Sequence, residues 1–123
     1  MSFKFGDESP LYTAVGIVNV PSNVTSKKTL FAVFATSLIF PDYFGENWDA
    51  FEECVRDLSW LPAGRVIVKH QDVPLVDDVR DAKIYLTILR DSADKLSKSN
   101  DHPLLVVFPV RCRDQVAWLL RLS

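Results

Sequence analysis

Six carboxylates lie between Asp42 and Asp57, and their types and close spacing could carry chemistry. They are Asp42, Glu46, Asp49, Glu52, Glu53 and Asp57, and Arg56 is the one cation in the same segment. The segment therefore has a net charge of −5, whereas the whole chain of 123 residues has −2. Clustered carboxylates can work as an acid and base pair in hydrolysis, or they can bind a cationic surface. Both uses are considered for this segment.

A helix from about Trp48 to Leu58 is predicted to position most of these carboxylates. Pro41 disfavours the helical conformation at the residue before it, so a preceding helix should end at Phe40. Gly45 allows a turn with positive φ. The side-chain oxygen of Asn47 can accept a hydrogen bond from a free N–H of the first helical turn. Asn47 is therefore the predicted N-cap.

The predicted helix has two different sides. Its apolar residues share one side, and these are Trp48, Phe51, Val55 and Leu58. Asp49, Glu53 and Asp57 share the opposite side, each four residues from the next. Charged helix faces are most often simply solvated, and the helix dipole alone favours Asp49 in the first turn. Glu53 and Asp57 have no such explanation, because like charges four residues apart repel by roughly 0.2–0.5 kcal/mol per pair. The acidic side of this helix could therefore be either a binding surface or a simply solvated one.

The rest of the chain alternates apolar strands with amphipathic helices. The predicted strands are Leu11 to Val20, Arg65 to Lys69 and Leu104 to Phe108, which are short apolar runs bounded by turn residues. The predicted helices run from Thr25 or Ser26 to about Ile39, from Asp77 or Asp78 to about Ser97, and from Asp114 to Leu122. Residues 1–10 should form an irregular lead-in. This order predicts an α/β fold, with a small parallel sheet flanked by helices in one domain over residues 1–123.

Helical spacing also predicts which side chains face the core. In the helix before Pro41 these are Leu30, Phe31, Phe34 and Leu38. In the longest helix they are Val79, Ala82, Leu86, Leu89, Ala93 and Leu96. The acidic residues before and within the first turn of this long helix suit its dipole.

Other catalytic arrangements find little support in the sequence. The four glycines are far apart, which excludes a phosphate-binding or dinucleotide-binding loop. His70 and His102 stand alone in loops, where we expect them to face solvent, and no His or Cys lies at metal-ligand spacing. Asp49 and Glu53 could approach the roughly 5–5.5 Å that separates the carboxyls of retaining glycosidases. Their side of the helix offers no apolar pocket to keep one carboxyl protonated, so a paired-carboxylate hydrolase is the weakest alternative.

Composition bounds the class of protein. Hydrophobic residues make up 48% and charged residues 24% of the chain, as in ordinary globular domains. The N-terminus lacks the apolar core of a signal peptide, and no apolar run reaches membrane-spanning length. Cys54 and Cys112 form no CxxC pair, and we expect two free thiols, with Cys54 buried, although a bridge between them stays open. A cytoplasmic location without membrane association is expected.

The order of residues around the acidic helix resembles a known family. The stretch Pro41-Asp42-Tyr43-Phe44-Gly45-Glu46-Asn47-Trp48-Asp49-Ala50-Phe51, followed by Glu53-Cys54, is similar to the barstar family of intracellular ribonuclease inhibitors. The resemblance spans about residues 12–110. It implies a three-stranded parallel sheet with the first strand at its centre. Residues 111–123 are then a C-terminal extension with a short helix that has no counterpart in the founding member.

The resemblance also implies a set of binding residues. Tyr43, Asp49 and Glu53 fall where the founding member presents a loop tyrosine and two helix aspartates. The implied partner-binding set is Tyr43, Phe44, Glu46, Asn47, Asp49, Glu52, Glu53 and Asp57. Two of these residues differ from those of the founding member. Glu53 is one methylene longer than the aspartate there, and Glu52 replaces a tryptophan.

The implied activity is inhibition of a ribonuclease, as in an immunity protein or antitoxin. A basic ribonuclease bound 1:1 is the implied partner, and its cationic groove would accept the acidic loop and helix in place of RNA phosphates. No cofactor or metal is implied, and direct nucleic-acid binding is not expected because only Arg111 and Arg113 lie close together among the basic residues. The alternative is a non-catalytic adaptor that binds a non-nuclease protein, for example through the helix containing Trp118.

Overall fold

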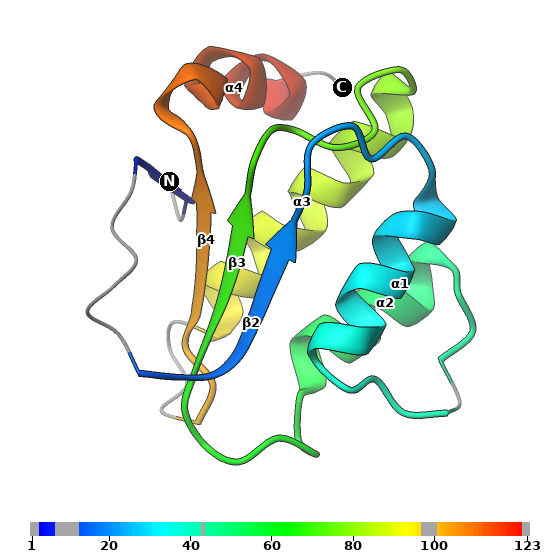
Figure 1. The fold of residues 1–123 in the computed structure, drawn as a ribbon, viewed down its shortest axis with the longest axis vertical. Coiled ribbons are helices and arrows are strands. Elements are labelled where there is room, and N and C mark those ends of the chain that lie inside the picture. Colours follow the sequence, from blue (N-terminus) through cyan, green and yellow to red (C-terminus); the bar gives the residue numbers. More distant parts are fainter. Residues whose placement is uncertain (1–2, 7–12, 43, 97–100, 122–123) are drawn as a thin grey trace.

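Four parallel strands form one sheet in the computed structural model, which describes residues 3–6, 13–42, 44–96 and 101–121 (Figure 1). The strands are β1 (Phe3–Phe5), β2 (Ala14–Val20), β3 (Arg65–His70) and β4 (Leu104–Phe108). Their order across the sheet is β1-β4-β3-β2. The predicted strands at 65–69 and 104–108 are thus confirmed almost residue for residue, and the first predicted strand begins later than expected within the described residues.

Two expectations about the sheet were wrong. The sheet has four strands rather than three, because Phe3 and Phe5 alternate with Lys4 and form a short strand where we expected an irregular lead-in. The ring centroid of Phe3 lies 5.3 Å from that of Phe108, so this strand extends the core. The strand β2 lies at the edge of the sheet rather than at its centre, because β3 pairs with β2 on one side and with β4 on the other.

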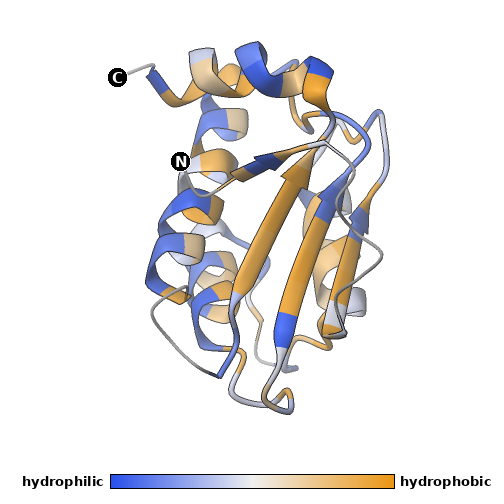
Figure 2. Cartoon of the chain, turned by 90° about the vertical axis from the view of Figure 1, so that its left-hand side faces the viewer, coloured by the Kyte–Doolittle hydropathy of each residue, from blue (hydrophilic) through white to orange (hydrophobic). Residues whose placement is uncertain are grey.

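Three helices connect the strands and pack on one face of the sheet. They are α1 (Lys27–Ser37), α2 (Trp48–Asp57) and α3 (Val79–Leu96). Their buried side chains form one core with the inward residues of the strands. Figure 2 shows that the central strands are mostly hydrophobic, whereas hydrophobic and hydrophilic residues alternate along the helices. The expected inward residues of α1 are all buried, and so are those of α3 except Val79, which is 40% exposed. No helix in the described part of the chain is long and apolar enough to cross a membrane.

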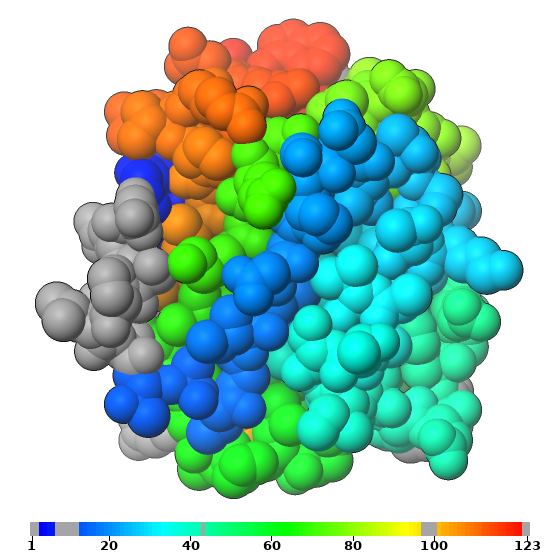
Figure 3. All heavy atoms as spheres, in the orientation of Figure 1, coloured from blue at the N-terminus to red at the C-terminus, as the bar shows by residue number. Residues whose placement is uncertain are grey.

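The helix boundaries follow the predicted caps. The Ser26 hydroxyl accepts a hydrogen bond from the Thr29 N–H at 3.2 Å and begins α1. The Asp78 carboxylate accepts from the Asp81 N–H at 3.1 Å and begins α3. After α1, the chain turns through Leu38 and Ile39 into the loop that leads to α2. The space-filling view shows α1, in cyan, beside β2, in blue (Figure 3).

The C-terminal region packs onto the domain. A 3₁₀ turn (Val110–Cys112) precedes α4 (Arg113–Arg121), one residue earlier than the predicted helix. Val116 and Leu119 are buried, and α4 contacts α3. Trp118 is 49% exposed, so only part of its ring contributes to the core.

The expectation that both histidines face solvent was wrong. His70 is the last residue of β3 and is buried, with Nδ1 2.9 Å from the Val107 carbonyl oxygen and Nε2 2.6 Å from the Tyr85 hydroxyl. His102 is also buried, and its Nε2 lies 3.2 Å from the Leu61 carbonyl oxygen. Both histidines therefore link strand ends or loops to the rest of the fold.

Candidate protein-binding surface

The acidic helix begins at the predicted cap. The Asn47 side-chain oxygen accepts a hydrogen bond from the Ala50 N–H at 2.8 Å, and its amide nitrogen donates to the Gly45 carbonyl oxygen at 3.4 Å. This pairing satisfies an N–H that would otherwise lack a partner at the helix start. Asn47 thus fixes the direction in which α2 leaves the loop.

The positive φ that we expected at Gly45 occurs one residue later. Glu46 has a φ of 53°, in the left-handed region, whereas Gly45 does not. A Cβ on Gly45 would lie 3.3 Å from the Asn47 amide nitrogen, so the glycine makes room for the capping side chain. The left-handed conformation at a non-glycine residue is unusual.

A cluster of aromatic rings holds α2 and its loop against α1 and α3. Phe51 is fully buried, and its ring centroid lies 4.8 Å from that of Phe34 and 5.3 Å from that of Phe31. Phe44 packs edge-on against Phe31 at 5.7 Å and against Phe40 at 5.0 Å. Phe44 is therefore half-buried and serves mainly to shape the loop.

A polar contact between α2 and α3 adds to this packing. The indole N–H of Trp48 donates to the Asp81 carboxylate at 3.1 Å. The other oxygen of Asp81 lies 4.0 Å from the Lys27 ammonium group of α1. Asp81 therefore joins three helices directly beneath the first turn of α2, where Asp49 begins the acidic side. Asp81 is one of the acidic residues in the first turn of α3 for which the sequence predicted only an interaction with the helix dipole, and its hydrogen bond with Trp48 was not predictable from sequence.

The acidic face of α2 consists of Asp49, Glu53 and Asp57, and all three are exposed. Their spacing of four residues places consecutive Cβ atoms roughly 5–6 Å apart. The opposite side of α2 is buried through Phe51, Cys54 and Val55, with Leu58 at the C-cap. The helix therefore presents a row of carboxylates on a support that cannot turn without breaking the core.

Glu52 differs from the acidic face because it has a partner. Its carboxylate forms an ion pair with the Arg56 guanidinium, one helical turn away, at 3.0 Å. This pair neutralises part of the charge on the flank of the helix. Tyr43, the remaining residue of the implied set, lies outside the described residues.

The acidic face affects the thiol of Cys54 on the same helix. Burial raises the pKa of the Cys54 thiol, and the negative charges of Glu53 and Asp57 raise it further. A protonated, buried thiol is a packing residue rather than a nucleophile. Cys112 is likewise buried, and neither cysteine forms a disulfide.

The arrangement favours binding over hydrolysis. Asp49 and Glu53 are both exposed, so neither has the apolar surroundings of a general acid. Among the described residues, no group of three or more His, Cys, Asp or Glu side chains could hold a metal ion. A rigid anionic row of this kind is suited to a cationic protein surface.

Comparison with protein families gives one match that covers most of the chain. The model of the family described as Barstar (barnase inhibitor) matches residues 19–109. The matched region begins in β2 and ends just after β4, so it includes the acidic helix and its loop. A comparison with curated proteins found no match.

Proposed function

The chain belongs to the barstar family, and from this premise we propose that it inhibits a ribonuclease by covering the enzyme's cationic active-site groove with α2 and the preceding loop. The observation that carries the proposal is the row formed by Asp49, Glu53 and Asp57. These carboxylates are exposed on a helix whose opposite side is buried through Phe51, Val55 and Leu58. Negative oxygens in a fixed row can take the places of RNA phosphates in such a groove.

The proposed roles differ along the surface. Asp49 and Glu53 are the central anchors, and Asp57 and Glu46 flank them along the chain. Tyr43, which lies outside the described residues, is the proposed loop contact. Asn47 and Phe44 hold the loop in position through the cap and the aromatic cluster. Glu52, which stands where the founding member has a tryptophan, contributes through its ion pair with Arg56.

The proposed inhibition requires only binding to the ribonuclease and no catalysis by the chain itself. A preformed anionic surface gains affinity because little side-chain or backbone freedom is lost on binding. Complementary charge also raises the association rate, an effect that salt reduces. We assign the chain a non-catalytic role with a basic ribonuclease as a 1:1 partner.

The test is capture followed by an activity assay. The wild-type chain and an Asp49→Lys/Glu53→Lys variant are immobilised, and extracts and culture fluid of the source organism are passed over both at low salt. We expect the wild type alone to retain a ribonuclease, which moderate salt elutes and which added wild-type chain inhibits. Equal ribonuclease activity in the eluates from both baits, or none from either, would contradict the proposal.

The adaptor is the second candidate, and the half-exposed Trp118 on α4 is the observation that favours it. An adaptor using this helix would hold the same partner with both baits and would be insensitive to moderate salt. Replacement of Trp118 by Ala would then release the partner, whereas the inhibitor should be unaffected by this change.

A further inference from the structure

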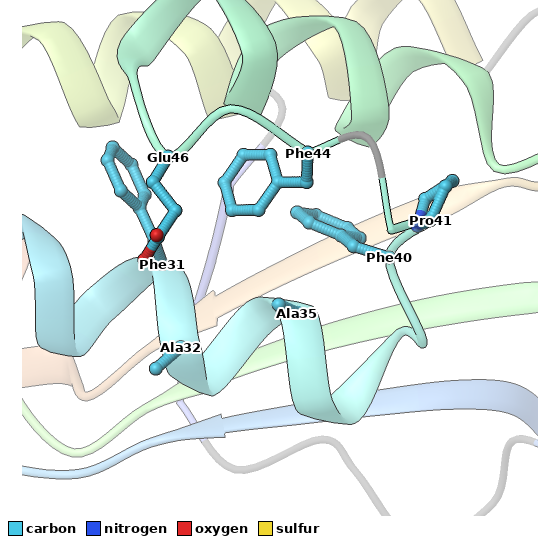
Figure 4. Close-up of a pocket in the computed structure, with 7 residues that line it drawn as sticks. All are labelled: Phe31, Ala32, Ala35, Phe40, Pro41, Phe44 and Glu46. Carbon is cyan, nitrogen blue, oxygen red and sulfur yellow. The ribbon is translucent and has the colours of Figure 1, made fainter.

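A small pocket lies between α1 and the loop before α2, beside the acidic face. Its volume is about 180 Å³, and it is lined by Phe31, Ala32, Ala35, Phe40, Pro41, Phe44 and Glu46. Figure 4 shows Ala35 of α1 below the rings of Phe40 and Phe44, and Ala32 below the Glu46 side chain at one end of the pocket. Small-molecule sites usually measure roughly 300–1,000 Å³, so this pocket is the size for a single side chain.

The carboxylate of Glu46 is placed at the mouth of this pocket. The left-handed backbone at Glu46, with a φ of 53°, sets the direction in which its side chain leaves the loop. Glu46 is exposed, and Figure 4 shows its carboxylate beside Phe31. Within the described part of the chain, this carboxylate has no hydrogen bond and no ion pair. Non-glycine residues in this conformation are often found at functional sites, where the surrounding structure holds them in place.

A second hollow of about 330 Å³ shares Glu46 and Phe31 with the pocket and is also lined by Lys27 and Lys28. Lys27 is directed to Asp81 of α3, at 4.0 Å. Lys28 is exposed and does not line the smaller pocket. Among the residues that line the smaller pocket, Glu46 is the one charged side chain, and Phe31, Phe40 and Phe44 supply aromatic rings.

The geometry points to an arginine side chain of the partner ribonuclease as the occupant of this pocket. This inference rests on the proposed function and extends the interface from the acidic face of α2 onto α1. A guanidinium group stacks on aromatic rings and pairs with a carboxylate through two parallel N–H bonds, and its three-carbon stem tolerates apolar walls. Ala32 and Ala35 leave the space for that stem, and Glu46 supplies the carboxylate. A lysine would gain less, because its ammonium group cannot form the paired contact.

Two variants test the pocket, each with a matched control. Glu46→Gln removes the carboxylate, and Asp42→Asn removes an exposed carboxylate of the same loop that does not line the pocket. Ala32→Trp fills the pocket from its exposed rim, and Thr36→Trp places the same ring one turn further along α1. We expect both pocket variants to bind the ribonuclease roughly tenfold or more weakly, as for the loss of a charge-assisted hydrogen bond. The controls should bind within about threefold of wild type, and thermal melting should confirm that all four variants fold.

A double-mutant cycle identifies the occupant. Each arginine near the ribonuclease's active site is replaced by glutamine, and each variant is measured against wild type and Glu46→Gln. We expect one arginine whose loss weakens binding to wild type but leaves binding to Glu46→Gln unchanged. Coupling of Glu46 to a lysine, or to no basic residue, would overturn the inference.

The inference and the proposed function fail in different ways. If Asp49→Ala abolishes binding while Glu46→Gln and Ala32→Trp bind as wild type does, the pocket is empty in the complex and the inhibitor remains. If Asp49→Ala also binds as wild type does, the acidic face is not the interface and both proposals fail.

Discussion

Asp49 is the single side chain on which the proposed interface depends most. It is exposed in the first turn of α2, so its loss from the free chain removes only a favourable interaction with the helix dipole. We predict that Asp49→Ala lowers the free energy of unfolding by no more than about 1 kcal/mol. The same change should weaken binding to the ribonuclease roughly tenfold to a hundredfold, as for a charge-assisted hydrogen bond.

Chemical denaturation and titration calorimetry measure these two effects separately. Asp114→Asn on α4 is a suitable control, because it removes an exposed carboxylate in the first turn of another helix. Equal affinity of wild type and Asp49→Ala would remove Asp49 from the interface.

His70 makes the stability of the fold depend on pH. Burial lowers the pKa of its imidazole from 6.5 to about 4, and the neutral ring donates from Nδ1 to Val107 and accepts from the Tyr85 hydroxyl. Below pH 6.5 the His70 imidazole is protonated in the unfolded chain, whereas in the folded chain it stays neutral down to about pH 4. The free energy of unfolding should therefore fall as the pH falls through this window, by about 3 kcal/mol in total.

Urea unfolding at pH 7, 5.5 and 4.5 measures this dependence. His70→Gln keeps a donor and an acceptor but does not titrate, so its unfolding free energy should change much less over the same range. An unaltered slope in the variant would assign the pH dependence to other groups.

Some residue-level features could be predicted from sequence and others could not. The spacing of apolar side chains correctly placed Phe31, Phe34 and Phe51 in the core, because helical periodicity is a local property. The burial of His70 could not be predicted, since its partners Tyr85 and Val107 come from other elements. The same holds for Trp48 and Asp81, which are 33 residues apart in sequence.

At the scale of elements, the contact between α2 and α3 orients the acidic face. Trp48→Phe keeps the aromatic packing but removes the N–H that Asp81 accepts. We predict that it lowers the free energy of unfolding by about 0.5–1.5 kcal/mol, the usual value of one hydrogen bond. In an Asp81→Ala background, Trp48→Phe should lower the free energy of unfolding much less, because the carboxylate that accepts the hydrogen bond is already absent.

Denaturation of both single variants and the double variant completes this cycle. The amide hydrogens at the start of α2 should also exchange faster in each single variant, since the anchor of that turn is lost. Additive stability losses would show that the indole N–H and the carboxylate act independently.

The end of α1 contains backbone strain that a substitution can relieve. Ile39 has a φ of 54° and is 70% exposed, at a position where helices usually have glycine. The Phe40 N–H donates to the Ala35 carbonyl oxygen at 3.0 Å and holds this turn. We predict that Ile39→Gly raises the free energy of unfolding by about 1 kcal/mol, because little burial is lost and the strain disappears.

A higher midpoint of denaturation for Ile39→Gly, with binding to the ribonuclease unchanged, is the expected result. A lower midpoint would mean that the isoleucine side chain contributes more than its exposure indicates. Ile39→Ala is the control, since it shortens the side chain without freeing the backbone.

Element boundaries were predictable where their signals are local. Asn47, Ser26 and Asp78 cap their helices as expected, because capping depends on a few consecutive residues. The left-handed conformations of Ile39 and Glu46 were not predictable, because neither residue type favours a positive φ.

At the scale of the whole molecule, neither the presence of β1 nor the order of the strands in the sheet could be predicted from the sequence. The strand β1 is three residues long and pairs with β4, about a hundred residues later in the chain. Neither its length nor its composition distinguishes it from a loop. The α/β class and the parallel sheet were predictable, since apolar strands alternate with helices along the chain.

The distribution of charge over the whole molecule sets the salt dependence of binding. The segment from Asp42 to Asp57 has a net charge of −5 while the chain has −2, so the remainder is net positive. We predict that the association rate with the ribonuclease falls steeply between 50 mM and 500 mM salt, because screening removes long-range attraction. Stopped-flow mixing measures this rate, and a rate independent of salt would contradict electrostatic steering by the acidic face.

The most direct test of the central claim is titration of the captured ribonuclease's RNA hydrolysis with the purified chain. We predict that activity falls in proportion to the added chain and is abolished at about one equivalent, while Asp49→Lys/Glu53→Lys has no effect at the same concentration. Full activity in the presence of excess wild-type chain would contradict the account, even if the two proteins still bind each other.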